Sequence, residues 1–210
     1  AASDVYKRQF VGALVSLERA VASGAWWAFA APVLLALGAI AGVVPMVLEP
    51  APRILIMIGT VLALGMYWPL WKRNYDPSVA VQALGAALAV GAGMQWLAGS
   101  SAAVITPWLT SYLILTIAGE RMELSRLIIR MKGVKARDAE ALAVCIALAL
   151  AVCFAGIAPW GTTLFGLALL VVAVRFAIRD VARYTVKSTG LPRFSAACML
   201  AGYAWLAVAG

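Results

Sequence analysis

The sequence predicts an all-α fold, a polytopic transmembrane helix bundle of about eight helices. Three observations support this fold class. The chain is 64% hydrophobic and 12% charged, with a mean hydropathy of +0.95, whereas a soluble domain is about 45–50% apolar. Its apolar runs have roughly the 17–25 residues that an α-helix needs to cross a bilayer. Its basic residues lie in every second gap between those runs.

The expected spans follow one another along a single transmembrane domain over residues 10–210. A first remnant, Phe10–Leu17, precedes six full spans, and a last span, Phe194–Gly210, is still apolar where the sequence ends. We therefore expect a fragment whose first and last helices are incomplete. The full spans are Trp26–Met46, Ile54–Trp71, Val79–Leu97, Ala102–Ala118, Ala141–Ala158 and Thr162–Ile178.

The first nine residues do not read as part of this pattern. The hexapeptide Asp4–Gln9, Asp-Val-Tyr-Lys-Arg-Gln, resembles a translated transposon end from a sequencing library. We therefore expect residues 1–9 to be an adapter artefact and native sequence to begin near Phe10. Processing or cloning segments of this kind are excluded from arguments about fold and orientation.

The distribution of basic residues predicts the orientation in the membrane. Fourteen Lys and Arg lie in the gaps near Arg19, Lys72–Ser78, Gly119–Glu140 and Arg175–Arg193, and the gaps between hold only Arg53. Short cytoplasmic loops retain Lys and Arg, so we expect a multi-pass protein of the bacterial inner membrane with cytoplasmic basic loops. The lipid bilayer is the expected partner. Orientation alone accounts for the net charge of +8, so nucleic acid is not expected, and nothing indicates an oligomeric state.

Residues that commonly carry chemistry are few. There is no His, the commonest metal and haem ligand. All three cysteines fall inside apolar runs, which argues against a disulfide framework. No phosphate-binding loop, zinc-protease motif or nucleophile elbow occurs, so a soluble-type hydrolase or nucleotide enzyme is disfavoured. No metal site and no cofactor are evident; haem or copper would need His from missing termini.

An internal repeat of four helices plus four is one interpretation of the spacing. Leu17–Ala20 closes the first remnant span, and the similar Gly119–Met122 closes the fifth span 102 residues later. Asp76 follows the third span and Asp180 follows the seventh, 104 residues later. Each pair lies at the inner end of an outside-to-inside helix, as two parallel halves would require.

The densest group of polar residues lies where the first and fifth spans reach the cytoplasmic side. Helical spacing sets Thr116, Glu120 and Glu123 on one face of the fifth helix. We expect Arg19 to pair with Glu120 or Glu123, and Glu18 with Arg121. One interpretation is a proton or ion relay, or an anion site; the other, which we favour, is an ion-pair network that organises the bundle. The candidate cluster is Glu18, Arg19, Thr116, Glu120, Arg121, Glu123 and Arg126.

Two further groups of residues bear on function. Arg175, Arg179 and Arg183 form a row on a helix that leaves the membrane, so they are candidate contacts for anionic lipid headgroups, or simply orient the helix. The fifth span is the most polar because it carries Thr110, Ser111 and Tyr112. We expect any pathway through the bundle to follow that helix.

Three segments resemble a family of uncharacterised bacterial multi-pass membrane proteins. They are Phe10–Val21, Leu115–Arg126 with its Gly-Glu-Arg-x-Glu-Leu-Ser-Arg string, and Gly190–Phe194 together with Gly202–Leu206. A more distant similarity links the chain to NnrS-type membrane proteins. That resemblance implies binding of haem and copper and a link to nitric oxide.

Three functional hypotheses follow. The first is an integral membrane protein whose Glu/Arg cluster organises the bundle and lines a proton or small-molecule path. The second, implied by the NnrS-type resemblance, is a haem- or copper-linked redox or nitric-oxide-response protein. The third is a small-solute transporter, which requires a water-accessible cavity near the middle of the membrane.

Overall fold

The computed structural model describes residues 2–44, 50–128 and 134–210, with side chains described for residues 12–44, 50–73, 75–125 and 138–210. This part of the chain contains helices and no strand, so the all-α class is confirmed. Six helices are long and apolar enough to cross a membrane. The chain is therefore a membrane-embedded helical protein, while its sidedness stays a prediction.

The six spanning helices agree closely with the expected apolar runs. Several of them are longer than the expected apolar run because polar flanking residues continue the helix. Asp76 starts the helix Pro77–Leu97 by accepting a hydrogen bond from the Ser78 amide at 2.8 Å. The spanning helices are α3 (Pro50–Asn74), α4 (Pro77–Leu97), α5 (Ala102–Ile128), α6 (Val134–Ala155), α7 (Gly161–Arg179) and α9 (Leu191–Ala209).

The first two expected spans differ from the structure. Phe10–Leu17 is the middle of a longer helix, α1 (Ala2–Ser23), whose N-terminal side chains lie outside the described residues. In place of one span over Trp26–Met46 there are a 3-10 turn, η1 (Trp26–Phe29), and a helix of twelve residues, α2 (Ala30–Ala41). Proline is favoured in a first helical turn, which explains why α2 starts just before Pro32.

One further short element lies between two of the spanning helices. A single-turn helix, α8 (Ala182–Thr185), connects α7 to α9. Asp180 begins this turn by accepting a hydrogen bond from the Ala182 amide at 3.0 Å, as Asp76 does for Ser78. The two aspartates that suggested a repeat thus share a local role, and the repeat itself stays a prediction.

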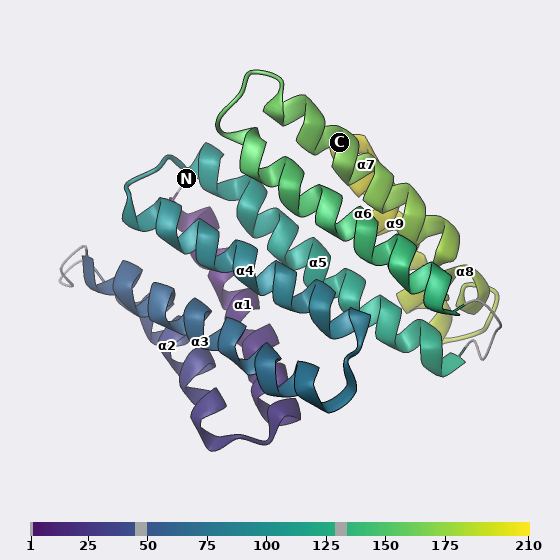
Figure 1. Cartoon of the computed structure of the whole chain (residues 1–210), viewed down its shortest axis with the longest axis horizontal. Helices are drawn as coiled ribbons and strands as arrows, with labels where there is room; N and C mark the ends of the chain where they lie inside the picture. The colour runs from purple at the N-terminus through teal and green to yellow at the C-terminus, as the bar shows by residue number, and fades with distance from the viewer. Residues whose placement is uncertain (1, 45–49, 129–133) are drawn as a thin grey trace.

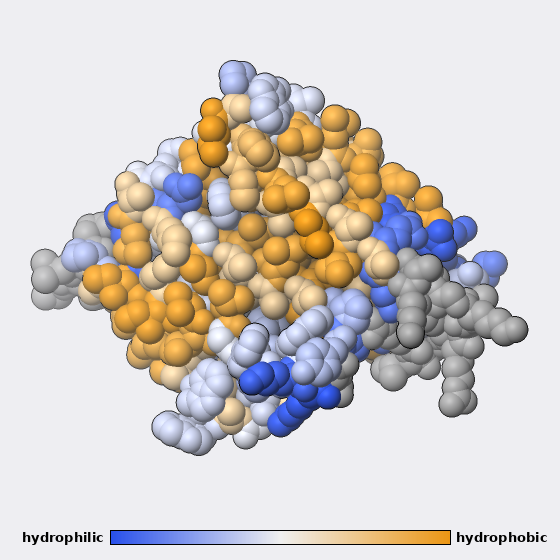
Figure 2. Space-filling view, viewed as in Figure 1, coloured by the Kyte–Doolittle hydropathy of each residue, from blue (hydrophilic) through white to orange (hydrophobic). Residues whose placement is uncertain are grey.

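The helices form a bundle in which chain neighbours pack together (Figure 1). Helix α4 packs most extensively on α5, and α1 passes behind α4 in this view to contact α2, α3 and α5. Helix α9 lies on α7. Apolar residues cover most of the visible face, with hydrophilic residues gathered at its edges (Figure 2), as expected for a surface in contact with hydrocarbon.

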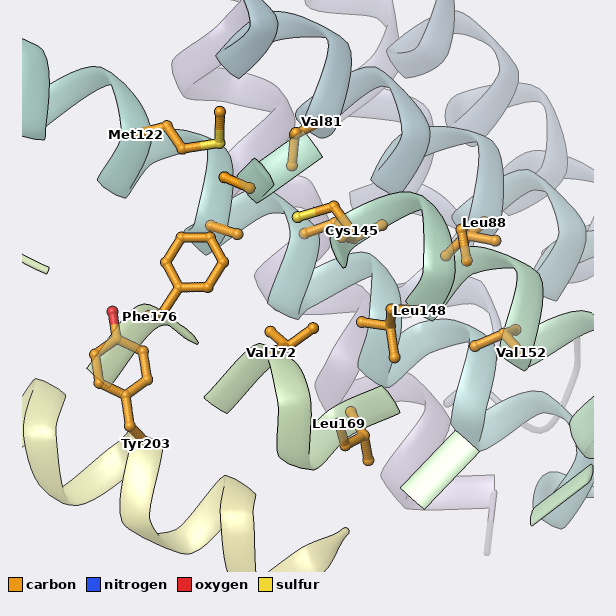
Figure 3. Packing of buried hydrophobic residues seen from close by; sticks show 14 residues of the cluster. Val81, Leu88, Met122, Cys145, Leu148, Val152, Leu169, Val172, Phe176 and Tyr203 are labelled. Atoms are coloured by element: carbon orange, nitrogen blue, oxygen red, sulfur yellow. The ribbon is translucent and has the colours of Figure 1, made fainter. Parts of the chain in front are cut away.

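Close packing of α4 on α5 depends on small residues. A Cβ atom on Gly85 would lie 3.1 Å from the Tyr112 carbonyl oxygen, and one on Gly91 would lie 2.3 Å from the Trp108 ring. The largest apolar core lies between α4, α5, α6, α7 and α9 (Figure 3). A smaller core between α1, α2 and α3 includes Ala20 and Met66. Helix α5 borders both regions and positions the candidate site.

Candidate functional site

The C-terminal parts of α1 and α5 place one guanidinium among three carboxylates. Arg19 Nη2 lies 3.4 Å from Glu120 Oε1 and 3.6 Å from Glu18 Oε1. Arg19 Nη1 lies 4.0 Å from Glu123 Oε2. Glu120 and Glu123 reach the same partner because residues three apart share a helix face. The structure therefore brings together Arg19 with Glu18, Glu120 and Glu123.

Burial within this network is uneven. The Arg19 side chain is 12% exposed, against 32% for Glu120, 53% for Glu123 and 66% for Glu18. Arg19 Nε is buried and has no hydrogen-bond partner among the described residues. All three N···O distances exceed the roughly 2.7–2.9 Å of a tight charge-assisted hydrogen bond. The arrangement is a loosely bonded network with one buried cation and carboxylates that reach outward.

Several residues of the predicted cluster make contacts other than those expected. Thr116 Oγ1 donates to the Tyr112 carbonyl oxygen at 2.9 Å, so it bonds its own helix. Glu18 pairs with Arg19 and not with Arg121. Because sequence neighbours face different directions on a helix, Arg121 shares a face of α5 with Ile114, Ile117 and Ala118 and not with Glu120. The side chain of Arg126 lies outside the described residues.

A small internal cavity adjoins the buried end of this network. It lies between helices α1 to α5, and its volume is about 20 Å³, which is room for a single water molecule. Arg19 forms part of its wall, with an otherwise largely apolar lining. Its hydroxyl-bearing wall residues are Ser16, Thr60, Tyr67 and Tyr112.

The hydroxyl groups of the cavity wall differ in their partners. Ser16 and Thr60 donate to carbonyl oxygens of their own helices at 2.9 and 2.8 Å. Tyr67 is 5% exposed and makes no hydrogen bond to another described residue. Of these residues only Tyr112 stood out in the sequence. In the sequence, a hydroxyl-bearing side chain within an apolar span is the feature that could have identified Tyr67. Only the tertiary structure shows that Tyr67 and Arg19 line the same cavity.

The three arginines of α7 and α8 have protein partners. Arg175 Nε lies 2.8 Å from Glu140 Oε1, and its side chain is 10% exposed. Arg179 Nη2 lies 3.7 Å from Glu140 Oε2. Arg183 donates to the Ile178 carbonyl oxygen at 2.8 Å, which caps the C-terminal end of α7. Glu140, which the sequence analysis did not single out, thus joins α6 to α7.

Metal-ligating residues do not cluster in the described part of the chain. No group of three or more Cys, Asp or Glu residues there is arranged to hold a metal ion. Cys145 is buried, Cys153 and Cys198 are exposed, and all three are free thiols. The largest concentration of ionisable groups beside an internal cavity is the network around Arg19.

Comparisons with known proteins identify a family without assigning an activity. No curated protein and no solved structure matches the chain. A family model matches residues 6–210, which is nearly its full length. The chain therefore belongs to the family described as "Domain of unknown function (DUF8744)".

Proposed function

We propose that the protein is a multi-pass inner-membrane protein that relays protons through the region enclosed by α1 to α5. The basic gaps face the cytoplasm in this proposal, so the Arg19 network lies at the cytoplasmic mouth. The alternation of Lys and Arg along the chain supports this orientation. The same network holds α1 against α5, so one cluster serves both the packing of the bundle and the relay.

The observation that carries the proposal is the cavity beside Arg19. Ionisable groups inside a membrane protein are expensive, and they commonly mark ion or proton pathways. Here the buried guanidinium borders a space lined in part by hydroxyl groups. Its volume of about 20 Å³ accommodates a water molecule but no organic solute. Size therefore favours proton transfer over transport of a small molecule.

The geometry supports a specific division of roles. Glu120 is 32% exposed, so its carboxylate can take up a proton from the cytoplasmic side. Arg19 neutralises the carboxylate charge and keeps the relay in place. A water molecule in the cavity would receive hydrogen bonds from Tyr67 or Tyr112, both of which line it. Hydroxyl groups and water form the kind of hydrogen-bonded chain along which a proton moves.

The test is proton flux into proteoliposomes that contain a pH-sensitive dye, driven by a potassium gradient and valinomycin. We expect flux above that of empty liposomes, and we expect Tyr67→Phe to reduce it several-fold, because this change removes one oxygen atom and keeps the ring. Tyr184→Phe is the matched control, since Tyr184 is 70% exposed on α8. Wild-type flux equal to that of empty liposomes, or equal loss in both variants, would overturn the proposal.

A further inference from the structure

A second, larger hollow lies on the opposite side of α5, between α5, α7 and α9. Its volume is about 220 Å³, against about 20 Å³ for the cavity beside Arg19. The lining is almost wholly apolar and includes Ile114, Ile117, Phe176 and Gly202. Ile117 is 44% exposed, and Gly202 is exposed. The hollow is therefore a groove that opens sideways between spanning helices.

A cationic side chain lies one helical turn beyond the groove on α5. Ile117 and Ala118 of the lining share one face of α5 with Arg121, three or four residues further on. Arg121 Nε is buried and has no hydrogen-bond partner among the described residues. The apolar groove is therefore followed by a cation on the same face of the same helix.

The carboxylate of Asp180, next to Tyr203, accepts two hydrogen bonds. Tyr203 donates a hydrogen bond to Asp180 Oδ2, and the Ala182 amide donates to Asp180 Oδ1 at 3.0 Å. Asp180 is 5% exposed. The Tyr203 ring lies beside Phe176, so the polar contact caps the apolar lining (Figure 3). No ion pair joins Asp180 to Arg121 among the described residues, so Arg121 is available to attract an anion.

We propose that this groove binds an anionic phospholipid of the inner leaflet, with one acyl chain between α5, α7 and α9 and the phosphate group at Arg121. An apolar groove between spanning helices that is followed by a cation on the same helix face complements both parts of such a lipid. This assigns headgroup binding to α5. The arginines on α7 and α8, by contrast, have protein partners. Arg175 and Arg179 contact Glu140, and Arg183 donates to the Ile178 carbonyl oxygen.

Two glycines provide a matched pair of variants for testing the groove. A Cβ atom on Gly202 would meet no atom within 4 Å, and the same holds for Gly65. Both sit inside spanning helices and line apolar hollows, Gly65 in one beside Tyr67 and Trp68 on α3. Leucine favours the helix over glycine, so neither Gly202→Leu nor Gly65→Leu is expected to disturb folding. Only Gly202→Leu fills the proposed lipid groove.

The experiment is native mass spectrometry of protein extracted from nanodiscs that contain equal amounts of phosphatidylglycerol and phosphatidylcholine. We expect one retained phosphatidylglycerol per chain. Arg121→Gln should lower the preference for phosphatidylglycerol about fivefold, the effect of one basic residue at a membrane surface. Gly202→Leu should abolish retention of either lipid, while Gly65→Leu leaves retention unchanged.

Three outcomes would overturn the lipid site. Equal retention in both glycine variants would identify the lipid as non-specific annular lipid. An unchanged preference in Arg121→Gln would remove the headgroup contact. A dimer in place of a lipid-bound monomer would show that a second copy of the chain covers the groove. Gly202 lines the groove and not the cavity beside Arg19, so Gly202→Leu should leave proton flux intact, and the two proposals fail independently.

Discussion

Neutralising Glu120 should cost less stability but more proton flux than neutralising Glu140. Each carboxylate pairs with a nearly buried arginine on a neighbouring helix. Arg19 is 12% exposed and lies 3.4 Å from Glu120, whereas Arg175 is 10% exposed and lies 2.8 Å from Glu140. The two sites therefore have similar burial on the cation side and different N···O separations. Only the first borders the cavity.

The expected loss of stability follows from exposure and distance. Breaking a buried ion pair costs about 3–5 kcal/mol, and an exposed pair is worth about 0.2–1 kcal/mol. Glu140 is 45% exposed and Glu120 is 32% exposed, so both pairs lie between these limits. The shorter contact of Glu140 should make Glu140→Gln cost about 2 kcal/mol. The longer contact of Glu120 should make Glu120→Gln cost about 1 kcal/mol.

The loss of proton flux should be larger for Glu120→Gln than for Glu140→Gln. We expect Glu120→Gln to abolish flux per folded molecule, because an amide cannot carry the proton, and Glu140→Gln to leave it near the wild-type value. Stability is measured by thermal unfolding in detergent, and flux is normalised to the folded fraction. Equal flux per folded molecule in Glu120→Gln and wild type would refute the relay. Double-mutant cycles with Arg19→Gln and Arg175→Gln measure each pair's coupling energy.

Two further predictions concern packing and orientation. Gly119→Ala should destabilise the bundle by about 1 kcal/mol in thermal unfolding, because the new Cβ atom would lie 2.8 Å from the Ser78 carbonyl oxygen and overpacking outweighs the gain in helix propensity. Gly65→Ala should stabilise the bundle in the same thermal assay, because its Cβ atom would meet no atom within 4 Å. In a cysteine-free background, Ser188→Cys should react with an impermeant maleimide only from the cytoplasmic side, and Ser100→Cys only from the opposite side. Labelling of both residues from one side would contradict the proposed orientation.

Much of the fold was predictable because hydrocarbon imposes a simple rule on sequence. A backbone in a bilayer must satisfy its own hydrogen bonds, so long apolar runs become helices. The expected spans Val79–Leu97 and Thr162–Ile178 coincide with α4 and α7 almost to the residue. The rule failed at Trp26–Met46, where hydrophobicity continues but the chain makes a 3-10 turn and a short helix. Hydrophobicity alone does not encode that interruption.

The candidate site was predictable in part. Equivalent depth on two helices suggested the pairing of Arg19 with Glu120 or Glu123, and the structure places these groups within 4.0 Å. The pairing of Glu18 with Arg121 does not occur, because the rotation of each helix about its own axis decides which neighbour a side chain faces. The same rotation turns Glu140 toward Arg175.

The sequence by itself determined membrane residence, the order of the spanning helices and the alternation of their basic ends, because hydrophobic length and charge act locally along the chain. Only the tertiary structure decided that Tyr67 and Arg19 line one cavity the size of a water molecule, and that an apolar groove lies on the other side of α5. Both arrangements depend on the rotation and close approach of packed helices. These are set by side-chain volumes from several helices together, and no single segment of sequence encodes them.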